Sequence, residues 1–309
     1  MSTPPTLQLS LGPVLFYWTR EHYANFYCEV ADWPLEIVTL GETVCSRRRD
    51  MKLDDWLGIG RELSQAGKQV ILASQTLIES EADLRDLRKI CDNGNFIVEA
   101  NDQSALQLLS HAGLPFIAGA ALNLYNPATL GVMNRAGMQR WQAPVEMSRD
   151  DLAQLIADCH QAGVNQPCEV FAYGHLPLAW SSRCFTARRH QKSKDRCQFV
   201  CQKYPEGLVL RTQESRDVFT LNGIQTLSSA CQDLRHELTT MTNMGVSVAR
   251  LSPRAEGMAE VVHAFDQARN GRLPIPDPLT LVEADICDGY WYGRPGMDNT
   301  HPRPTSAEA

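Results

Sequence analysis

Short runs of β-branched and aromatic residues alternate with longer amphipathic segments along almost the whole chain. A short run bounded by turn residues predicts a strand, and an amphipathic segment of about ten residues predicts a helix. The predicted strands are 14–18, 35–40, 69–73, 96–100, 116–119, 139–142, 169–173 and 246–251. Helices are predicted between most of them, at 54–66, 81–91, 104–111, 150–162 and 258–269.

Strands that are separated by helices form βαβ units and a mainly parallel sheet. Eight such strands favour a (β/α)8 TIM-type barrel, regular or distorted, with an open doubly wound sheet as the alternative. Segment 186–222 breaks the rhythm and is predicted to be an insertion after the seventh strand, with a hairpin at 207–211 and 217–221. The prediction is therefore one domain over 1–298, with a Cys-rich insertion at about 180–222, followed by a disordered tail at 299–309.

The overall composition narrows the class of protein. With 43% hydrophobic residues the chain can bury a core, and its formal charge of −7 argues against general binding of nucleic acid. The apolar run 14–18 is too short to span a bilayer, and the first ten residues lack a basic leader. Ten cysteines without a secretory signal indicate a reducing, cytoplasmic location, in which clustered cysteines favour metal over disulfides.

Four cysteines form the most informative motif. Cys184, Cys197 and Cys201 lie in one strongly basic segment, and Cys45 follows the second predicted strand. Four thiolates are the ligand set of a tetrahedral zinc or of a four-iron cluster. On a barrel, the loops after the second and seventh strands meet at the C-terminal face, so the four thiols can converge. Their spacing does not decide between the metals, and Cys231, on a predicted helical stretch, is the alternative ligand.

No catalytic residue can be assigned from the sequence, but three side chains near strand ends are candidates: Glu42, Glu169 and His175. Each also has a structural interpretation, since an acid suits a helix N-terminus and a lone histidine is usually a hydrogen-bonded structural residue. Arg183 and Arg188 are candidates for anion binding, because a guanidinium can hold a carboxylate with two hydrogen bonds.

Three segments together resemble the collagenase-like peptidase family, and within it the members that act in anaerobic ubiquinone biosynthesis. They are Gly-Glu-Thr-Val-Cys-Ser at 41–46, Glu-Val-Phe at 169–171 and Pro-Leu-Ala-Trp-Ser-Ser-Arg-Cys-Phe-Thr-Ala-Arg at 177–188. The resemblance runs through nearly the whole chain, and the cysteine pattern is its most specific part.

Peptidase-type members of that family carry Glu-x-Phe-x-His-Gly-Ala-x-Cys, followed by Ser-Gly-x-Cys. Cys184 matches the second cysteine of this pattern, but Tyr173 replaces the histidine and Pro177 replaces the first cysteine. The resemblance implies that Cys45 supplies the missing ligand, as in the ubiquinone-biosynthesis members. These departures speak against peptidase activity.

The resemblance implies a function in some detail. One [4Fe-4S] cluster is expected on the four cysteines, and a heterodimer is expected with a homologous subunit that carries its own cluster. The pair would support oxygen-independent hydroxylation of the aromatic ring of a prenylated ubiquinone precursor, with prephenate as hydroxyl donor. A lipid-binding accessory protein would present the prenylated substrate. The ligands that carry over are Cys45, Cys184, Cys197 and Cys201.

Two other functions stay open at this stage. The chain can be a hydrolase of the peptidase type, although its residues do not suggest a nucleophile with an adjacent base. It can also be a non-catalytic partner, in which a metal site only organises the insertion and an interface. The role of a cluster, whether catalytic, electron-relaying or structural, does not follow from the residues.

Overall fold

Eight parallel strands close into a barrel. In the computed structural model, which describes residues 7–271 and 285–300, each of these strands pairs with two neighbours, and β11 joins β1 to β7. The closure excludes the open sheet. The barrel strands are β1 (Gln8–Leu11), β2 (Ile37–Leu40), β3 (Gln69–Ala73), β4 (Ile97–Ala100), β5 (Phe116–Ala118), β6 (Met138–Gln142), β7 (Cys168–Trp180) and β11 (Val246–Leu251).

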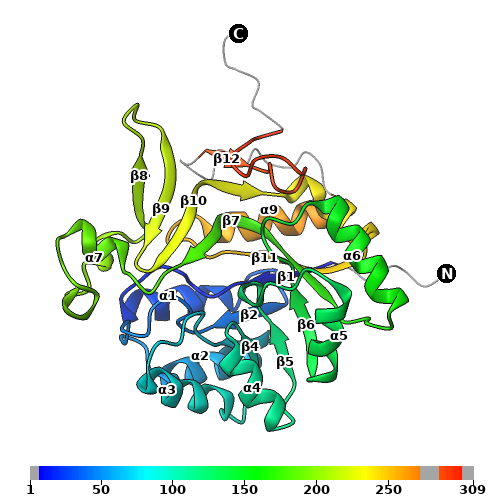
Figure 1. Ribbon diagram of the computed structural model, residues 1–309, viewed down its shortest axis with the longest axis horizontal. Coiled ribbons are helices and arrows are strands. Elements are labelled where there is room, and N and C mark those ends of the chain that lie inside the picture. Colours follow the sequence, from blue (N-terminus) through cyan, green and yellow to red (C-terminus); the bar gives the residue numbers. More distant parts are fainter. Residues whose placement is uncertain (1–6, 272–284, 301–309) are drawn as a thin grey trace.

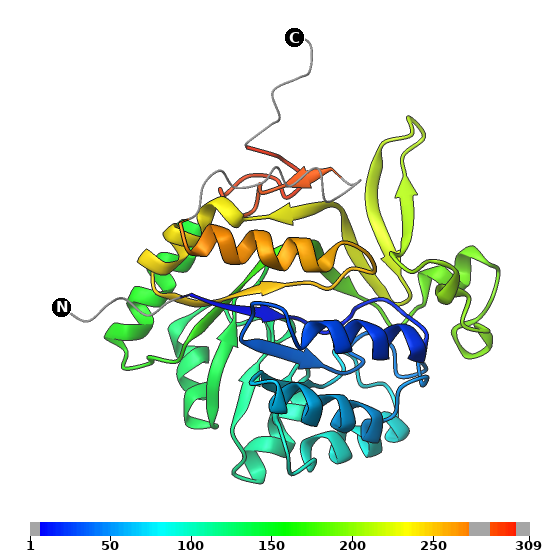
Figure 2. The ribbon, with the colours of Figure 1, turned by 180° about the vertical axis from the view of Figure 1, so that it is seen from behind.

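Helices surround the barrel and cover its outer face (Figures 1 and 2). Several begin where the sequence carries a capping residue: Asp102 accepts a hydrogen bond from the Ser104 amide, and Ser148 accepts one from the Asp151 amide. The outer helices are α1 (Arg20–Val30), α2 (Leu53–Gln65), α3 (Glu81–Cys91), α4 (Gln103–His111), α5 (Pro127–Arg135), α6 (Arg149–Gln161), α8 (Leu238–Asn243) and α9 (Met258–Arg269). None of the helices in the described ranges is long and apolar enough to cross a membrane.

The predicted first strand at 14–18 is wrong. Strand β1 precedes it, and 14–18 is a buried connection whose apolar residues pack in the core. Side chains form hydrogen bonds with part of its backbone. The Leu15 carbonyl accepts from Arg48 at 2.7 Å and from Asn222 at 2.7 Å. A short apolar run is compatible with a strand or with any other buried segment. Here the run is not part of the sheet, and the hydrogen bonds of its Leu15 carbonyl are made with side chains.

The insertion after the seventh barrel strand is confirmed. Strand β7 continues beyond the barrel wall and pairs antiparallel with β10 (Gln225–Asp233). The hairpin of β8 (Leu208–Arg211) and β9 (Asp217–Asn222) joins β10 and projects from the body of the molecule (Figure 1). Short helices precede it: α7 (Phe185–Arg189), η2 (Lys194–Arg196) and η3 (Val200–Lys203). The remaining elements are η1 (Ala120–Leu122), η4 (Arg235–Glu237) and β12 (Ile286–Cys287), which pairs with β10.

The predicted tail at 299–309 lies mostly outside the described residues. Of its first two residues, Thr300 donates through its amide and its hydroxyl to the two carboxylate oxygens of Asp288, at 2.7 and 2.6 Å. Residues 301–309 are not described.

The barrel interior has an apolar layer and a charged layer. Ile37, Ile71, Ile117 and Val248 form a separate buried cluster. One step further along the strands lie four charged side chains that are all at least 90% buried: Glu99, Arg140, Glu169 and Arg250. Inward-facing residues alternate along each barrel strand, which places these two sets in successive layers. The charged layer lies toward the C-terminal ends of the strands.

Candidate metal centre

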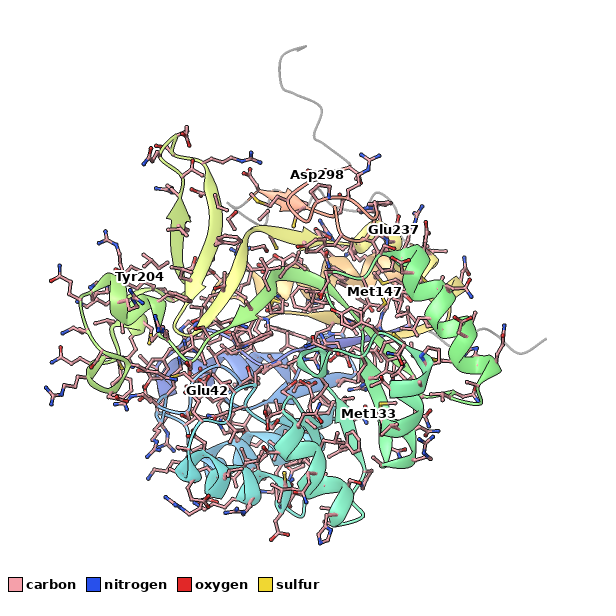
Figure 3. All side chains as sticks on the ribbon, viewed as in Figure 1. Glu42, Met133, Met147, Tyr204, Glu237 and Asp298 are labelled. Atoms are coloured by element: carbon pink, nitrogen blue, oxygen red, sulfur yellow. The ribbon has the colours of Figure 1, made fainter. Side chains whose placement is uncertain are left out.

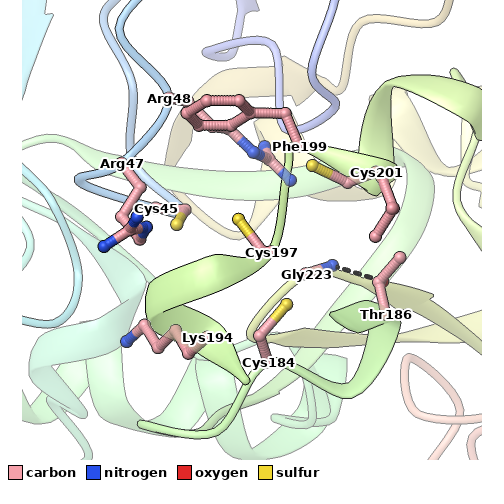
Figure 4. A pocket seen from close by; sticks show the side chains of 11 residues that line it. Cys45, Arg47, Arg48, Cys184, Thr186, Lys194, Cys197, Phe199, Cys201 and Gly223 are labelled. Atoms are coloured by element: carbon pink, nitrogen blue, oxygen red, sulfur yellow. Dashed lines mark hydrogen bonds between the residues drawn. The ribbon is translucent and has the colours of Figure 1, made fainter. Parts of the chain in front are cut away.

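The four predicted cysteines line one pocket between the barrel and the insertion (Figure 4). Cys45 comes from the loop after β2, Cys184 directly precedes α7, Cys197 follows η2, and Cys201 lies within η3. The space between them is about 360 Å³, part of it open to solvent. Cysteines that lie between 139 and 156 positions apart in the chain therefore meet, as the barrel topology predicts.

The loop that carries Cys45 is shaped by Glu42. One oxygen of its carboxylate accepts hydrogen bonds from the amides of Val44 and Cys45, at 2.8 and 3.0 Å, and lies 3.6 Å from Arg48 Nη1. Burial raises the pKa of Glu42, and the charge of Arg48 opposes this shift. Figure 3 places Glu42 and Tyr204, a residue of the insertion, on the same side of the molecule. The geometry gives Glu42 a positioning role in the Cys45 loop.

The turn into this loop depends on Gly41, which has a φ of 125°. A Cβ atom at this position would lie 2.9 Å from the backbone oxygen of Ala73. We expect Gly41→Ala to lower the free energy of unfolding by about 1–3 kcal/mol, because it adds a backbone clash to a conformation that L residues rarely adopt.

Urea denaturation measures this effect, and Gly58→Ala is the matched control. Gly58 lies in α2, and a Cβ atom added there would meet no atom within 4 Å, so alanine should be neutral or stabilising. Equal stability of the two variants would contradict the role given to Gly41.

The other three cysteines are held by short, irregular segments. Cys184 caps α7, with its sulfur accepting from the Ala187 amide at 3.4 Å. Between Cys197 and Cys201, two consecutive non-glycine residues have positive φ, Gln198 at 52° and Phe199 at 53°. Such conformations are uncommon in non-glycine residues and cluster at ligand-binding sites. The strained turn directs two thiols toward the same pocket.

Arg48 is the central basic residue of the site, and the sequence did not single it out. It is buried, and its guanidinium donates to the Leu15 carbonyl at 2.7 Å and to Asn222 Oδ1 at 2.6 Å. Burial raises the pKa of the thiols of Cys45 and Cys201, whereas the charge of Arg48 lowers it. A buried cation beside thiols favours their thiolate form. The only signal in the sequence was the Arg-Arg-Arg run at 47–49.

The predicted anion-binding residues lie elsewhere. Arg183 and Arg188 are exposed, and neither lines the cysteine pocket. Arg47 and Lys194 line it instead. Arg47 Nη2 donates to the backbone oxygen of Asp195 at 2.7 Å, which ties the Cys45 loop to the insertion.

His175 and Cys231 lie away from the cysteine pocket. His175 is on β7, and its Nδ1 is 2.9 Å from the Ser228 carbonyl; burial lowers its pKa. Cys231 is buried on strand β10, where it pairs with His175, so the predicted helix at this position is wrong. Neither residue lines the pocket, and the structure gives His175 a hydrogen-bonded, structural environment.

Glu169 belongs to the charged layer of the barrel. Its Oε1 is 2.5 Å from Arg250 Nε, and its Oε2 is 2.9 Å from Arg140 Nε, an ion pair by distance that lacks hydrogen-bond geometry. Arg250 also binds Glu99. Two carboxylates and two guanidinium groups thus balance one another inside the barrel. Glu169 therefore has a structural role, in which its carboxylate compensates the buried charges of Arg140 and Arg250.

A family model for peptidase family U32 matches residues 28–273. The chain belongs to peptidase family U32. This is the collagenase-like peptidase family that its motifs resemble.

Three solved structures match this chain at low sequence identity. The U32 peptidase Mk0906 is 11% identical, with 82% of this chain and 95% of that chain covered and a TM-score of 0.46. A mutant tryptophan synthase α-subunit from Pyrococcus furiosus is 10% identical, with 86% and 97% covered and a TM-score of 0.47. A protein from Clostridium thermocellum that binds 5-methyl-5,6,7,8-tetrahydrofolic acid is 7% identical, with 87% and 96% covered and a TM-score of 0.47. The barrel assignment rests on the strand pairing described above.

Proposed function

We propose that this U32 family member is a UbiV-like iron–sulfur subunit that supports oxygen-independent hydroxylation in ubiquinone biosynthesis. The observation that carries the proposal is the convergence of Cys45, Cys184, Cys197 and Cys201 on one pocket. The departures from the peptidase pattern, with Tyr173 and Pro177 in place of histidine and cysteine, support it further.

Four cysteines can hold either a zinc ion or a [4Fe-4S] cluster, and the resemblance to the ubiquinone-biosynthesis members is what favours the cluster. Within residues 7–271 and 285–300, no group of three or more His, Cys, Asp or Glu side chains is arranged to hold a metal ion. Zinc–sulfur distances of about 2.3 Å require four sulfurs to lie within about 4 Å of one another. A [4Fe-4S] cluster, for which four cysteines are the usual ligands, takes the same four thiolates at a wider spacing.

The chain's own basic residues suit the charge of such a group. Four thiolates on a cluster leave a net negative charge, and Arg48, Arg47 and Lys194 line the pocket that would hold it. The cluster would supply electron transfer or Lewis-acid chemistry at the barrel mouth. Arg48 places a positive charge next to the thiols, and Phe199 lies beside them in the wall of the pocket (Figure 4). Glu42 fixes the loop of Cys45 by accepting a hydrogen bond from the Cys45 amide.

The proposal includes partners and a location. A UbiU-like homologous subunit would complete a cytoplasmic heterodimer, a lipid-binding accessory protein would present the prenylated aromatic precursor, and prephenate would donate the hydroxyl group. These assignments are what the resemblance of the cysteine pattern to the ubiquinone-biosynthesis members implies. A peptidase-type hydrolase gains no support from the site, since the described residues that line the cysteine pocket include no histidine to act as a base.

Anaerobic purification tests the cluster. We expect a brown protein with broad visible absorbance, and about four irons and four sulfides per chain. Metal analysis and absorbance spectroscopy measure this directly. A colourless protein that holds about one zinc would overturn the cluster and leave a structural metal site.

A further inference from the structure

The insertion, residues 180–222, has a charge opposite to that of the rest of the chain. It contains nine Lys or Arg and four Asp or Glu residues, a net charge of +5. Because the whole chain carries −7, the remaining residues carry −12. Helix α7 and the β8–β9 hairpin project from the same end of the molecule (Figures 1 and 2). The insertion is therefore a basic lobe on an acidic body.

Most cations of the basic lobe are unpaired, whereas most of its acidic residues are neutralised. Three of the four acidic residues lie 2.5–3.9 Å from an arginine: Asp195, Glu206 and Asp217. Six of the nine cations are exposed and form no ion pair within the described residues: Arg183, Arg188, Arg189, Arg196, Lys203 and Arg216. A cluster of exposed cations that the chain does not neutralise attracts a negatively charged surface.

The basic lobe also exposes apolar side chains. Six large hydrophobic residues are exposed among the described residues, and three of them lie in these 43 residues: Phe199, Val209 and Leu210, at 38%, 42% and 46% exposure. One face of the hairpin carries two apolar cross-strand pairs, Leu208–Leu221 and Leu210–Phe219. Within the described ranges, none of these four residues belongs to a buried cluster or packs against one. Binding to a lipid surface increases both with buried apolar area and with attraction to anionic headgroups.

The exposed apolar residues favour lipid over nucleic acid as the occupant of this surface. Single-stranded nucleic acid binds by stacking its bases on exposed aromatic rings. The ring of Phe199 already contacts Tyr17, with ring centroids 5.8 Å apart. Val209 and Leu210 are aliphatic, and aliphatic side chains suit the acyl boundary of a bilayer. An anionic bilayer also repels the acidic body, which leaves the basic lobe as the part that faces the lipid.

We propose that the basic lobe docks on the surface of an anionic bilayer. Val209 and Leu210 enter the interface, and the six unpaired cations contact lipid phosphates. The lobe carries Cys184, Cys197 and Cys201, so docking brings the cysteine pocket to the lipid surface, where prenylated molecules reside. That consequence rests on the proposed function, whereas the docking itself depends neither on the cluster nor on hydroxylation.

Co-sedimentation of the full chain with lipid vesicles tests the docking. One set of vesicles contains equal parts of phosphatidylglycerol and phosphatidylcholine, and the other contains phosphatidylcholine alone. We expect at least about tenfold tighter binding to the anionic vesicles, because several cations each contribute to the attraction. Raising NaCl from about 0.1 M to about 0.5 M should weaken this binding, because salt screens exposed charges. Equal binding to both sets of vesicles, or no binding to the anionic set, would overturn the proposal and leave the cluster proposal untouched.

Charge reversal shows whether the basic lobe makes the contact. The double variant Arg189→Glu and Arg216→Glu should weaken binding to the anionic vesicles about tenfold or more. The matched control, Arg61→Glu with Arg85→Glu, makes the same change in net charge at exposed positions of α2 and α3, and should bind like wild type. An equal loss in both double variants would mean that net charge, and not the lobe, determines binding.

A second pair of variants tests the apolar contact. Val209→Thr with Leu210→Thr keeps β-branched residues in β8 and should weaken vesicle binding at least about threefold. Leu114→Thr with Val132→Thr removes equally exposed apolar groups from the body and should not. Unchanged binding in the β8 variant would refute the insertion of these side chains into the interface.

Competition identifies the class of partner. Polyuridylate and polyglutamate are added to vesicle-bound protein at the same concentration of negative charge as the lipid. We expect neither to displace half of the protein, because neither offers an apolar phase. Displacement by polyuridylate would reassign the basic lobe to nucleic acid, and displacement by polyglutamate would reassign it to an acidic protein.

Discussion

Replacing any one of the four pocket cysteines with alanine is expected to abolish retention of the cluster. A [4Fe-4S] cluster takes one thiolate per iron, so three cysteines leave one iron without its protein ligand. We expect the iron content to fall from about four per chain to below about one after desalting without oxygen. Iron and sulfide assays on the variants of Cys45, Cys184, Cys197 and Cys201 measure the loss.

Cys91→Ala is the control for these variants. Cys91 is the last residue of α3, on the outside of the barrel, and burial raises the pKa of its thiol to about 11. Its replacement should leave iron content unchanged, with at most a modest cost in stability from the smaller side chain. Wild-type iron in all four pocket variants would show that these cysteines are not the ligands.

The barrel could be predicted because its strands and helices each carry a local pattern. Strands β3 and β11 and helices α3 and α9 lie at the predicted bounds. The first strand was misplaced because two of the four residues of β1, Gln-Leu-Ser-Leu, are polar. The run at 14–18 is more apolar and therefore matched the pattern of a buried strand better. The polar Ser10 is fully buried in the closed barrel.

The convergence of the cysteines could also be predicted, because barrel topology brings loop ends together. The residues around them could not. Arg48 and Asn222 are 174 positions apart, and neither lies in a sequence motif that predicts its hydrogen-bond partner. Cys231 was assigned to a helix, but β10 contains register shifts and polar residues that obscure its alternation. Contacts between distant segments, rather than local propensity, decide these parts of the site.

The charged layer inside the barrel leads to a large effect on stability. Glu169 is fully buried between Arg250 and Arg140, and Arg250 also pairs with Glu99. Glu169→Gln preserves the shape of the side chain and removes one negative charge, which leaves two buried guanidinium groups with one carboxylate. Removing one partner of a buried ion pair typically costs about 3–5 kcal/mol, and we expect a loss of unfolding free energy in that range.

The pH dependence of this loss identifies its cause. Burial opposes ionisation of Glu169, but the charges of Arg250 and Arg140 outweigh it, and its pKa is lowered from the ordinary value of 4.5. The stability that Glu169 contributes is therefore complete above that value and is lost as the pH falls through the lower pKa of the folded state. Urea denaturation should show the full difference between wild type and Glu169→Gln at pH 7, and a shrinking difference below about pH 4.5. Glu81→Gln, which removes an exposed ion pair with Arg88, should cost less than about 1 kcal/mol. A difference that stays constant down to pH 3 would mean that packing, and not charge, accounts for the loss.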